Sequence, residues 1–233
     1  MDTLDCIYNR RSIRKFLNIP VEWFKIGRIL EAGLNAPSAG NLIDFRFMVI
    51  NDDAKKKEIA KHCMNQNWMA NAHVYIVVTS TYVKTQRFYG VRGEKLYSIQ
   101  SAAAATQNML LAAHSLDLGA CWVGAFDEDL VKELLKIPDY ARVQSIIPIG
   151  YTDEKPPRPP KYSLTDMVHF NFYGDNAAKM SDIRTEVLKE WSPYTERAVN
   201  KIKDTIDNSS TIGEKITKHA KNLHENIKKK FNK

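Results

Sequence analysis

The stretch "SAAAATQNMLLAAHSLDLGACWVGAF" (residues 101–126) carries much of the information about the fold. Its first half is rich in alanine, the strongest helix former, and predicts the centre of a long helix over residues 95–115. Small side chains along such a helix also allow another helix to approach closely. The second half, "LGACWVGAF" (118–126), predicts a turn, a strand and a loop, in which Gly124 and Ala125 leave the backbone uncovered. Bare backbone at this point can approach a flat ligand and offer it N–H groups.

Strands and helices alternate loosely on both sides of this stretch. The run "AHVYIVVTS" (72–80) is almost continuously apolar and predicts a strand with both faces covered. Asp127 is placed to cap a helix that ends before Pro138. The other predicted elements are helices over 2–9, 20–33 and 53–65, strands over 45–50 and 143–151, and an extended proline-rich segment over 152–164. Together these elements indicate an α+β core, or a mixed α/β one, that ends near Gly174.

The tail after this core has a different pattern. Apolar residues from Met180 to Phe231 recur every three or four positions, which predicts two or three amphipathic helices over residues 175–233. We therefore expect two parts, 1–174 and 175–233, with the tail covering apolar surface on the core or on another subunit. A role at a membrane surface or on nucleic acid is the alternative, since the tail holds 13 Lys and Arg against 9 Asp and Glu.

Composition limits the class of protein. The chain has 233 residues, of which 44% are hydrophobic and 26% are charged, and its net charge is +7. These values are ordinary for a soluble globular protein, and no apolar run is long enough to span a membrane. The three cysteines are widely spaced, and no apolar leader precedes the first helix. We expect a cytoplasmic protein with reduced cysteines that serve as packing residues.

Three further segments could carry chemistry. The arginines of "RRSIR" (10–14) suit bidentate hydrogen bonds to phosphate, although the segment could equally be a solvated helix end. "NAPSAGN" (35–41) predicts a tight polar loop. "PPRPPK" (156–161) is either a stiff arm that carries Arg158 and Lys161 to one anion or an interdomain linker. Neither common glycine-rich nucleotide fingerprint is present, and no metal-ligand spacing or catalytic triad is recognisable.

In their order and spacing, the four segments resemble the nitroreductase-like FMN-dependent oxidoreductases. "RRSIRKF" is similar to the family's R-R-S-x-R-x-F, and "APSAGNLIDFRFMVI" to its A-P-S-x-x-N-x-Q-P-W-x-F-x-V-I. Residues 101–126 resemble its long central helix and flavin loop. "PIGYTDEKPPRPPKYSLTDMVHF" resembles its G-Y-P…(R/K)-x-P-L-x-(D/E)-x-V ending. The resemblance runs from about Leu4 to Phe172.

The resemblance implies a central mixed β-sheet flanked by helices, in an intertwined homodimer with two FMN sites at the subunit interface. The implied cofactor-binding residues fall into four groups. Arg10, Arg11, Ser12 and Arg14 would hold the phosphate and ribityl region, and Arg158 and Lys161 would reach the same phosphate. Pro37, Ser38 and Asn41 would contact the isoalloxazine ring from the other subunit, and Val123, Gly124 and Ala125 would face the ring with backbone N–H near N5 and O4.

The implied activity is a ping-pong oxidoreductase reaction. Hydride would pass from NADH or NADPH to flavin N5 and then to a small oxidant such as a nitroaromatic, a quinone or an activated alkene. This activity needs no catalytic side chain, no metal, and no nucleic-acid or membrane partner. Two alternatives remain: a non-catalytic flavin- or anion-binding module whose basic tail engages nucleic acid or membrane, and a specialised dehalogenase or flavin-fragmenting enzyme.

The chain departs from the family pattern at a few positions. Ile43, Asp44 and Phe45 stand where the family usually has Gln-Pro-Trp. Ile43 cannot form the hydrogen bonds of a glutamine, so we expect a changed flavin contact at this position. In the proline-rich arm, Ser163 replaces the common proline.

Overall fold

The computed structural model describes residues 2–174, which fall into two compact units. The first unit is Met1–Pro159 and contains the sheet and six of the described α-helices. The second unit is Pro160–Lys233, and its described part, residues 160–174, holds the short helix α7 (Leu164–Met167). The amphipathic helices predicted for residues 175–233 lie outside the described residues.

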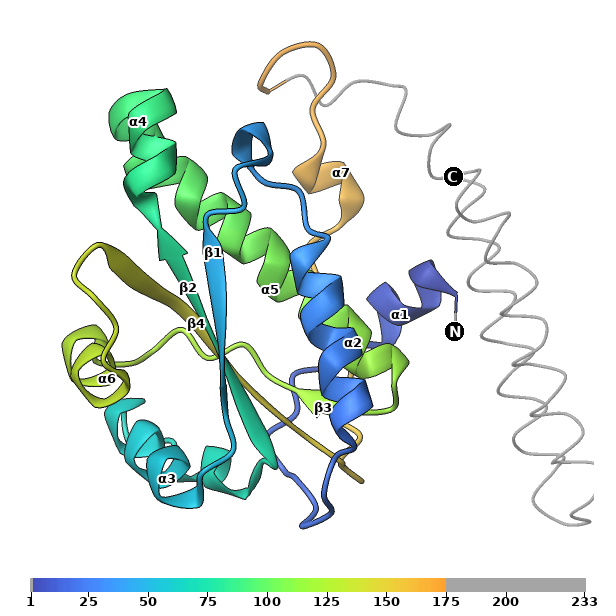
Figure 1. Ribbon diagram of the computed structural model, residues 1–233. Coiled ribbons are helices and arrows are strands. Elements are labelled where there is room, and N and C mark those ends of the chain that lie inside the picture. Colours follow the sequence, from blue (N-terminus) through green and yellow to red (C-terminus); the bar gives the residue numbers. More distant parts are fainter. Residues whose placement is uncertain (1, 175–233) are drawn as a thin grey trace, which may run out of the picture. The chain divides into compact units, whose positions relative to one another are not determined.

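The first unit is built on one four-stranded sheet (Figure 1). Its strands are β1 (Phe45–Ile50), β2 (Val74–Thr81), β3 (Gly119–Ala120) and β4 (Ala141–Gly150), in the order β1-β2-β4-β3. All pairs of these strands are antiparallel. A single parallel bridge, between Ser12 and Ala120, gives the sheet its mixed character within residues 2–174. The α+β architecture predicted from the sequence is confirmed.

Strand β2 lies in the middle of the sheet and is buried on both faces, as its apolar run predicts. Val74, Ile76 and Val78 belong to one apolar cluster, which also contains residues of α2 (Trp23–Leu34) and α5 (Ser98–Ser115). Tyr75 and Val77 belong to a second cluster on the other face. That cluster includes residues of α3 (Asp53–His62) and α6 (Glu128–Leu135). The alternation of side chains along a strand divides one continuous apolar run between two cores.

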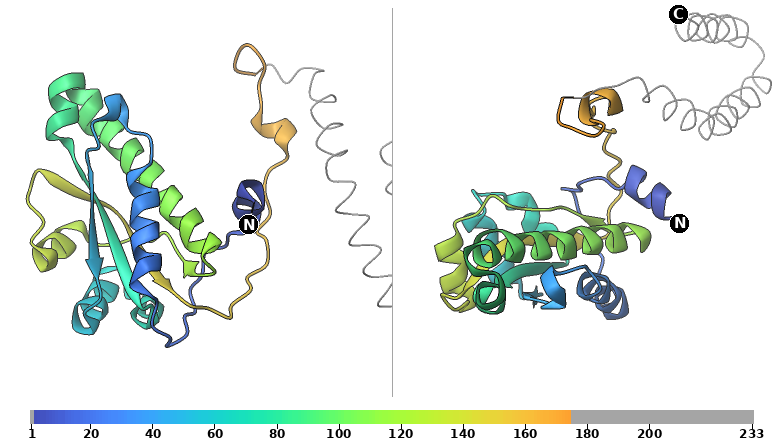
Figure 2. Two further views of the ribbon diagram at one scale, coloured as in Figure 1. Left: turned by 45° about the vertical axis from the view of Figure 1, so that its right-hand side comes forward. Right: turned by 90° about the horizontal axis from the view of Figure 1, so that it is seen from above.

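Helices α2 and α5 run side by side on one face of the sheet (Figure 2). Close packing requires a residue without a side chain where they meet, because a Cβ on Gly33 would lie 2.8 Å from Cγ of Met109. The long helix predicted over 95–115 is found as a π-helical turn, η3 (Gly93–Tyr97), followed by α5. The predicted N-terminal helix is α1 (Thr3–Asn9). It is joined to α5 by the Cys6 thiol, which donates to the Leu111 carbonyl at 3.3 Å.

Helix α4 (Tyr82–Arg92) is not predicted from the sequence. The chain reverses at Gly90, whose φ of 60° and ψ of −144° suit glycine. It then packs η3 against α4 so closely that a Cβ on Gly93 would overlap the carbonyl of Thr85. Two glycines therefore make possible a turn between helices that the apolar pattern does not reveal.

Pro148 explains why β3 is only two residues long. Val123 and Ile146 exchange two backbone hydrogen bonds of 2.9 and 3.0 Å, in the same register that pairs Ala120 with Ile149. In the antiparallel alternation, the next hydrogen-bonded pair in this register is Cys121 with Pro148. Proline has no N–H to donate, so the ladder is interrupted between Ala120 and Val123. The interruption lies directly before the loop that contains Gly124 and Ala125.

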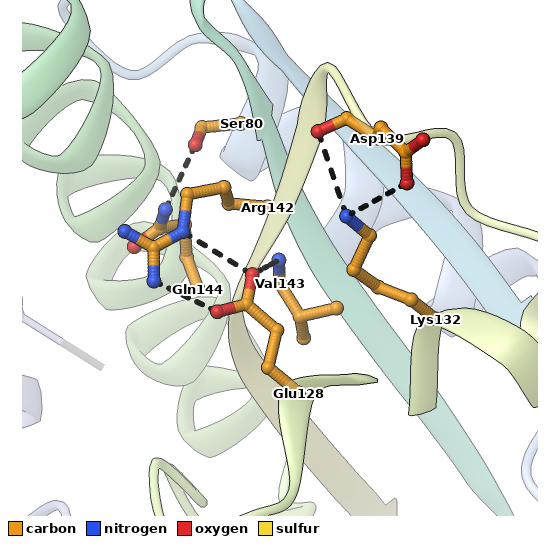
Figure 3. A network of polar contacts seen from close by, with 7 residues as sticks. All are labelled: Ser80, Glu128, Lys132, Asp139, Arg142, Val143 and Gln144. Atoms are coloured by element: carbon orange, nitrogen blue, oxygen red, sulfur yellow. Dashed lines mark hydrogen bonds and ion pairs between the residues drawn. The ribbon is translucent and has the colours of Figure 1, made fainter. Parts of the chain in front are cut away.

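A polar network holds α6 to the sheet (Figure 3). The Asp127 carboxylate accepts from the Leu130 N–H at 3.1 Å, which confirms the predicted N-cap. Glu128, in the first turn, accepts two hydrogen bonds from Arg142 of β4, at 2.7 and 3.2 Å, and one from the Val143 N–H at 3.2 Å. Arg142 is the main cause that holds the pKa of Glu128 below its usual value.

Replacing Glu128 by Gln should lower the free energy of unfolding by about 0.5–1 kcal/mol at neutral pH, because the pair with the half-exposed Arg142 is screened by solvent. The folded-state pKa of Glu128 is depressed, so its contribution is present above the unfolded pKa and is lost as pH falls through the folded pKa. The gap between wild type and Glu128→Gln in urea titrations should therefore close in acid. Asp129→Asn, in the same helical turn, is the matched control. An equal loss in both variants would assign the effect to the helix dipole alone.

Candidate functional site

The edge of the sheet beside β3 brings together segments that are distant in the sequence. The Ser12–Ala120 bridge includes a hydrogen bond from the Ile13 N–H to the Ala120 carbonyl at 3.0 Å. The basic segment is thereby attached to the strand that leads directly into Cys121–Ala125. Two of the four segments predicted from the sequence to form one site thus become neighbours.

The start of the proline-rich arm lies along the same segment. The Leu17 N–H donates to the Tyr151 carbonyl at 2.8 Å, and the Thr152 hydroxyl donates to the Lys15 carbonyl at 2.8 Å. The Glu154 carboxylate accepts the N–H groups of Arg14 and Lys15, at 2.8 and 3.0 Å. We call the surface formed by residues 10–14, 118–125 and 152–156 the basic edge.

The three arginines of the basic edge have different surroundings. Arg11 donates from Nη1 to the carbonyls of Tyr8 and Arg10, both at 2.8 Å, and so closes the C-terminal end of α1. The Arg14 guanidinium lies over the ring of Trp68, 5.8 Å from its centroid. Arg10 follows α1 directly and lines a pocket.

That pocket has a volume of about 580 Å³. Its charged and titratable lining residues are Arg10, Arg11, His114, Asp117, Glu154 and Lys155. Two buried nitrogen atoms in its lining residues, Arg11 Nε and His114 Nε2, have no hydrogen-bond partner within the described part of the chain. Buried polar atoms are rarely left unpaired, so this pocket is suited to a ligand that supplies acceptors. An anion would also meet the three cationic side chains.

The loop after Val123 offers backbone donors. Gly124 and Ala125 are exposed, and no residue within 2–174 accepts a hydrogen bond from their N–H groups. A Cβ on Gly124 would meet only the Trp122 indole, at 3.6 Å, so this backbone is open to a flat ligand. The buried thiol of Cys121 precedes the loop, and burial raises its pKa.

Two residues near this loop were missed by sequence reasoning. Gln66 donates from Nε2 to the Ala125 carbonyl at 3.4 Å, and Trp68 stacks on Phe16 as well as under Arg14. Both belong to the segment that contains η2 (Asn67–Asn71) or immediately precedes it. A tryptophan in a short polar segment was the available signal, but no pattern linked it to residues 10–14.

The loop of residues 35–41 lies elsewhere. The Ala39 N–H faces the Ser101 hydroxyl at 3.4 Å, in the first turns of α5, and the Ser38 hydroxyl accepts from the Ile43 N–H at 3.1 Å. His114 marks the opposite end of the same helix. At 1.5 Å per residue, Ser101 and His114 are about 20 Å apart along the axis. Figure 1 shows this blue loop and β3 near opposite ends of α5.

Residues in and just after this loop differ in their exposure and backbone conformation. Pro37 and Asn41 are exposed, and Asn41 adopts a left-handed conformation with a φ of 55°. Ile43 also has a positive φ, of 47°, which for a β-branched residue costs roughly 1–2 kcal/mol. The bond to Ser38 helps to hold this strained backbone.

Asp44 is 1% exposed, and neither of its carboxylate oxygens has a hydrogen-bond partner in the described residues. Burial raises its pKa, while the nearby hydroxyls of Thr85 and Ser101 lower it. The effect of burial is larger than that of the hydroxyls, so the pKa of Asp44 is raised. A buried acidic group thus stands where the resembled family has proline.

The two basic residues of the arm belong to different units of the chain. Arg158 is exposed and belongs to the first unit. Lys161 is exposed and belongs to the second unit, so its approach to a phosphate at the basic edge stays a prediction.

Two features are absent from residues 2–174. No cluster of three or more His, Cys, Asp or Glu side chains there could hold a metal ion. No helix in that range combines the length and the apolar character required to cross a bilayer.

Comparisons with known proteins agree with the fold and the order of the motifs. A protein from Methanothermobacter thermautotrophicus, with the provisional name NADH dehydrogenase/NAD(P)H nitroreductase, is 35% identical over 162 residues, which are 67% of this chain and 80% of the relative. The structure of an FMN-dependent nitroreductase from Clostridium difficile R20291 matches with a TM-score of 0.61 and 30% identity, over 73% of this chain and 99% of that one.

A more distant structure covers more of the chain. The NADPH:FMN oxidoreductase from Vibrio harveyi, solved in complex with NAD+, has a TM-score of 0.68 and 25% identity, over 86% of this chain and 90% of that one. The family model of the nitroreductases matches residues 7–68 and 63–151, which include the basic segment, the polar loop, α5 and the loop after β3. The chain belongs to the nitroreductase family.

Proposed function

We propose that this protein is an FMN-dependent oxidoreductase that takes hydride from NADH or NADPH and delivers it to a small oxidant. The observation that carries the proposal is the basic edge, where a cationic pocket adjoins a loop and, among residues 2–174, two buried nitrogens of the pocket's lining residues and the loop's backbone N–H groups have no partner. One part suits a phosphate and the other suits the polar rim of a flat heterocycle. Membership in the nitroreductase family and the names of the relatives support FMN as the ligand.

The residues of the basic edge fit the phosphate end of FMN. In this proposal Arg10, Ser12 and Arg14 hold the phosphate and ribityl chain, because guanidinium groups form charge-assisted hydrogen bonds with phosphate. Arg11 contributes through Nε, since its Nη1 is already bonded to two carbonyls. Arg158 and Lys161 are proposed to approach the same phosphate from the arm.

The residues of the loop fit the ring. Val123 is bonded twice to Ile146, which anchors the start of the loop that carries the N–H groups of Gly124 and Ala125. Backbone N–H groups fixed before the ligand arrives can stabilise negative charge without reorganisation. The bound flavin would supply the redox chemistry, and the chain would bind, orient and tune it.

The protein's own side chains need not act as nucleophiles. Burial raises the pKa of the thiols of Cys6, Cys63 and Cys121, and that of Cys63 reaches about 12. All three therefore stay protonated near neutral pH. The proposed oxidants are nitroaromatics, quinones or activated alkenes, which accept hydride without covalent attachment to the enzyme.

A second copy of the chain completes the site in this proposal. Ser38 and Asn41 lie at one end of α5, and the basic edge lies at the other end. A homodimer would bring Pro37, Ser38 and Asn41 of one protomer to the ring bound at the basic edge of its partner. The exposed positions of Pro37 and Asn41 are compatible with this role.

The function can be tested on the purified full-length protein. It should bind FMN and then show the absorbance spectrum of a flavin. Addition of NADH or NADPH without oxygen should bleach that spectrum. Subsequent addition of a quinone or nitroaromatic should restore it. A colourless protein that does not bind added FMN in a fluorescence titration would contradict the proposal.

Replacing Arg10 or Arg14 by Ala should weaken FMN binding by roughly 10- to 150-fold, because each loses a charge-assisted hydrogen bond of about 1.5–3 kcal/mol. The same variants should lose less affinity for riboflavin, which lacks the phosphate. The control Arg28→Ala, on the exposed side of α2, should change the affinity for neither FMN nor riboflavin. Fluorescence titrations with both ligands measure these differences. Unchanged FMN affinity in both variants would contradict the assignment of phosphate binding to this segment.

A further inference from the structure

His114 is a titratable residue in the pocket of the basic edge, and no role has been assigned to it. It lies in the last turn of α5 and lines the pocket that contains Arg10 and Arg11. Its Nε2 atom is buried and has no hydrogen-bond partner among residues 2–174. A buried imidazole nitrogen without a partner carries a cost that a ligand could remove.

We propose that His114 is an additional phosphate contact in this pocket and that it takes up a proton when a phosphate dianion binds. The proposal rests on the function proposed above and adds a residue and a pH dependence to it. The proton comes from solvent and adds to Nε2, and the resulting N–H donates to a phosphate oxygen. No bond of the phosphate is broken.

The free pocket disfavours a charged His114. Burial is the main cause that lowers its pKa, and the positive charges of Arg10 and Arg11 lower it further. Asp117 acts in the opposite direction without reversing the shift. His114 is therefore neutral near pH 7 in the ligand-free protein, and its Nε2 can accept a proton.

The remaining charged groups of the pocket do not supply the missing partner. Glu154 already accepts two backbone N–H groups, from Arg14 and Lys15. Asp117 is exposed to solvent, and Lys155 adds a further positive charge. A dianion among these groups would compensate the positive charges of the arginines. It would raise the pKa of His114, because a nearby negative charge favours protonated imidazole.

The sign of the pH dependence follows from this reversal. The bound-state pKa of His114 lies above its free-state pKa, so the complex holds more protons than the separate partners. FMN affinity should then fall as pH rises, by up to about tenfold per pH unit between the two pKa values. Free phosphate monoesters have a second pKa of about 6 and are almost fully dianionic above about pH 7, so the range from about pH 7 to 8.5 reports mainly the protein's contribution.

The test compares His114→Gln with His73→Gln. His73 is also half-buried with a lowered pKa, but it lines a different pocket. Fluorescence titrations with FMN across this pH range should show declining affinity in wild type and in His73→Gln, and a nearly flat profile in His114→Gln. Riboflavin should give no such difference between the variants. NMR of the wild-type histidine ring resonances should show the His114 signal titrating at higher pH after FMN is added.

The outcomes separate the two proposals. An FMN profile in His114→Gln that follows wild type, or a His114 resonance unmoved by FMN, would overturn the role of His114 and leave FMN binding intact. Failure of the wild-type protein to bind FMN and riboflavin would overturn the proposed function itself. Since the NMR measurement uses the wild-type chain, it decides the question even if His114→Gln does not fold.

Discussion

The pairing of Ser12 and Ile13 with Ala120 is the contact on which the organisation of this site depends. It is one short parallel bridge at the edge of an otherwise antiparallel sheet, yet it attaches the basic segment to the strand that leads into Gly124 and Ala125. Pro148 limits the neighbouring ladder, because it has no N–H to offer Cys121. The backbone beyond Val123 is thereby held at its start and left open at the residues that would meet a flat ligand.

Helix α5 sets the distances in the molecule. It packs against α2 across a point where Gly33 touches Met109, and it is buried against the central sheet. Its N-terminal end lies beside the polar loop of residues 35–41, and its C-terminal end carries His114 into the pocket of the basic edge. A rigid helix about 20 Å long between these points keeps them apart within one chain. This separation is the physical reason to propose that two copies cooperate in one site.

Much of the fold could be predicted from local sequence signals. The strand over 45–50, the N-cap at Asp127 and the two-sided burial of β2 were all confirmed, because each depends on residues close together in the chain. Helix α4 was missed because its apolar residues do not form a continuous stripe and Gly90 interrupts it. The pocket around His114, and the approach of Trp68 to Arg14, depend on residues more than 50 positions apart, which no local pattern can bring together.

The most direct test of the central claim is a mixed dimer that combines Arg10→Ala in one chain with Ser38→Ala and Asn41→Ala in the other. Co-expression with two different tags would isolate it from the parent dimers. If each flavin site takes Arg10 from one protomer and the polar loop from its partner, the mixed dimer has one intact site and should bind one FMN per dimer with wild-type affinity. Binding no tighter than that of the two parent variants would show that the site lies within a single chain and would contradict the account.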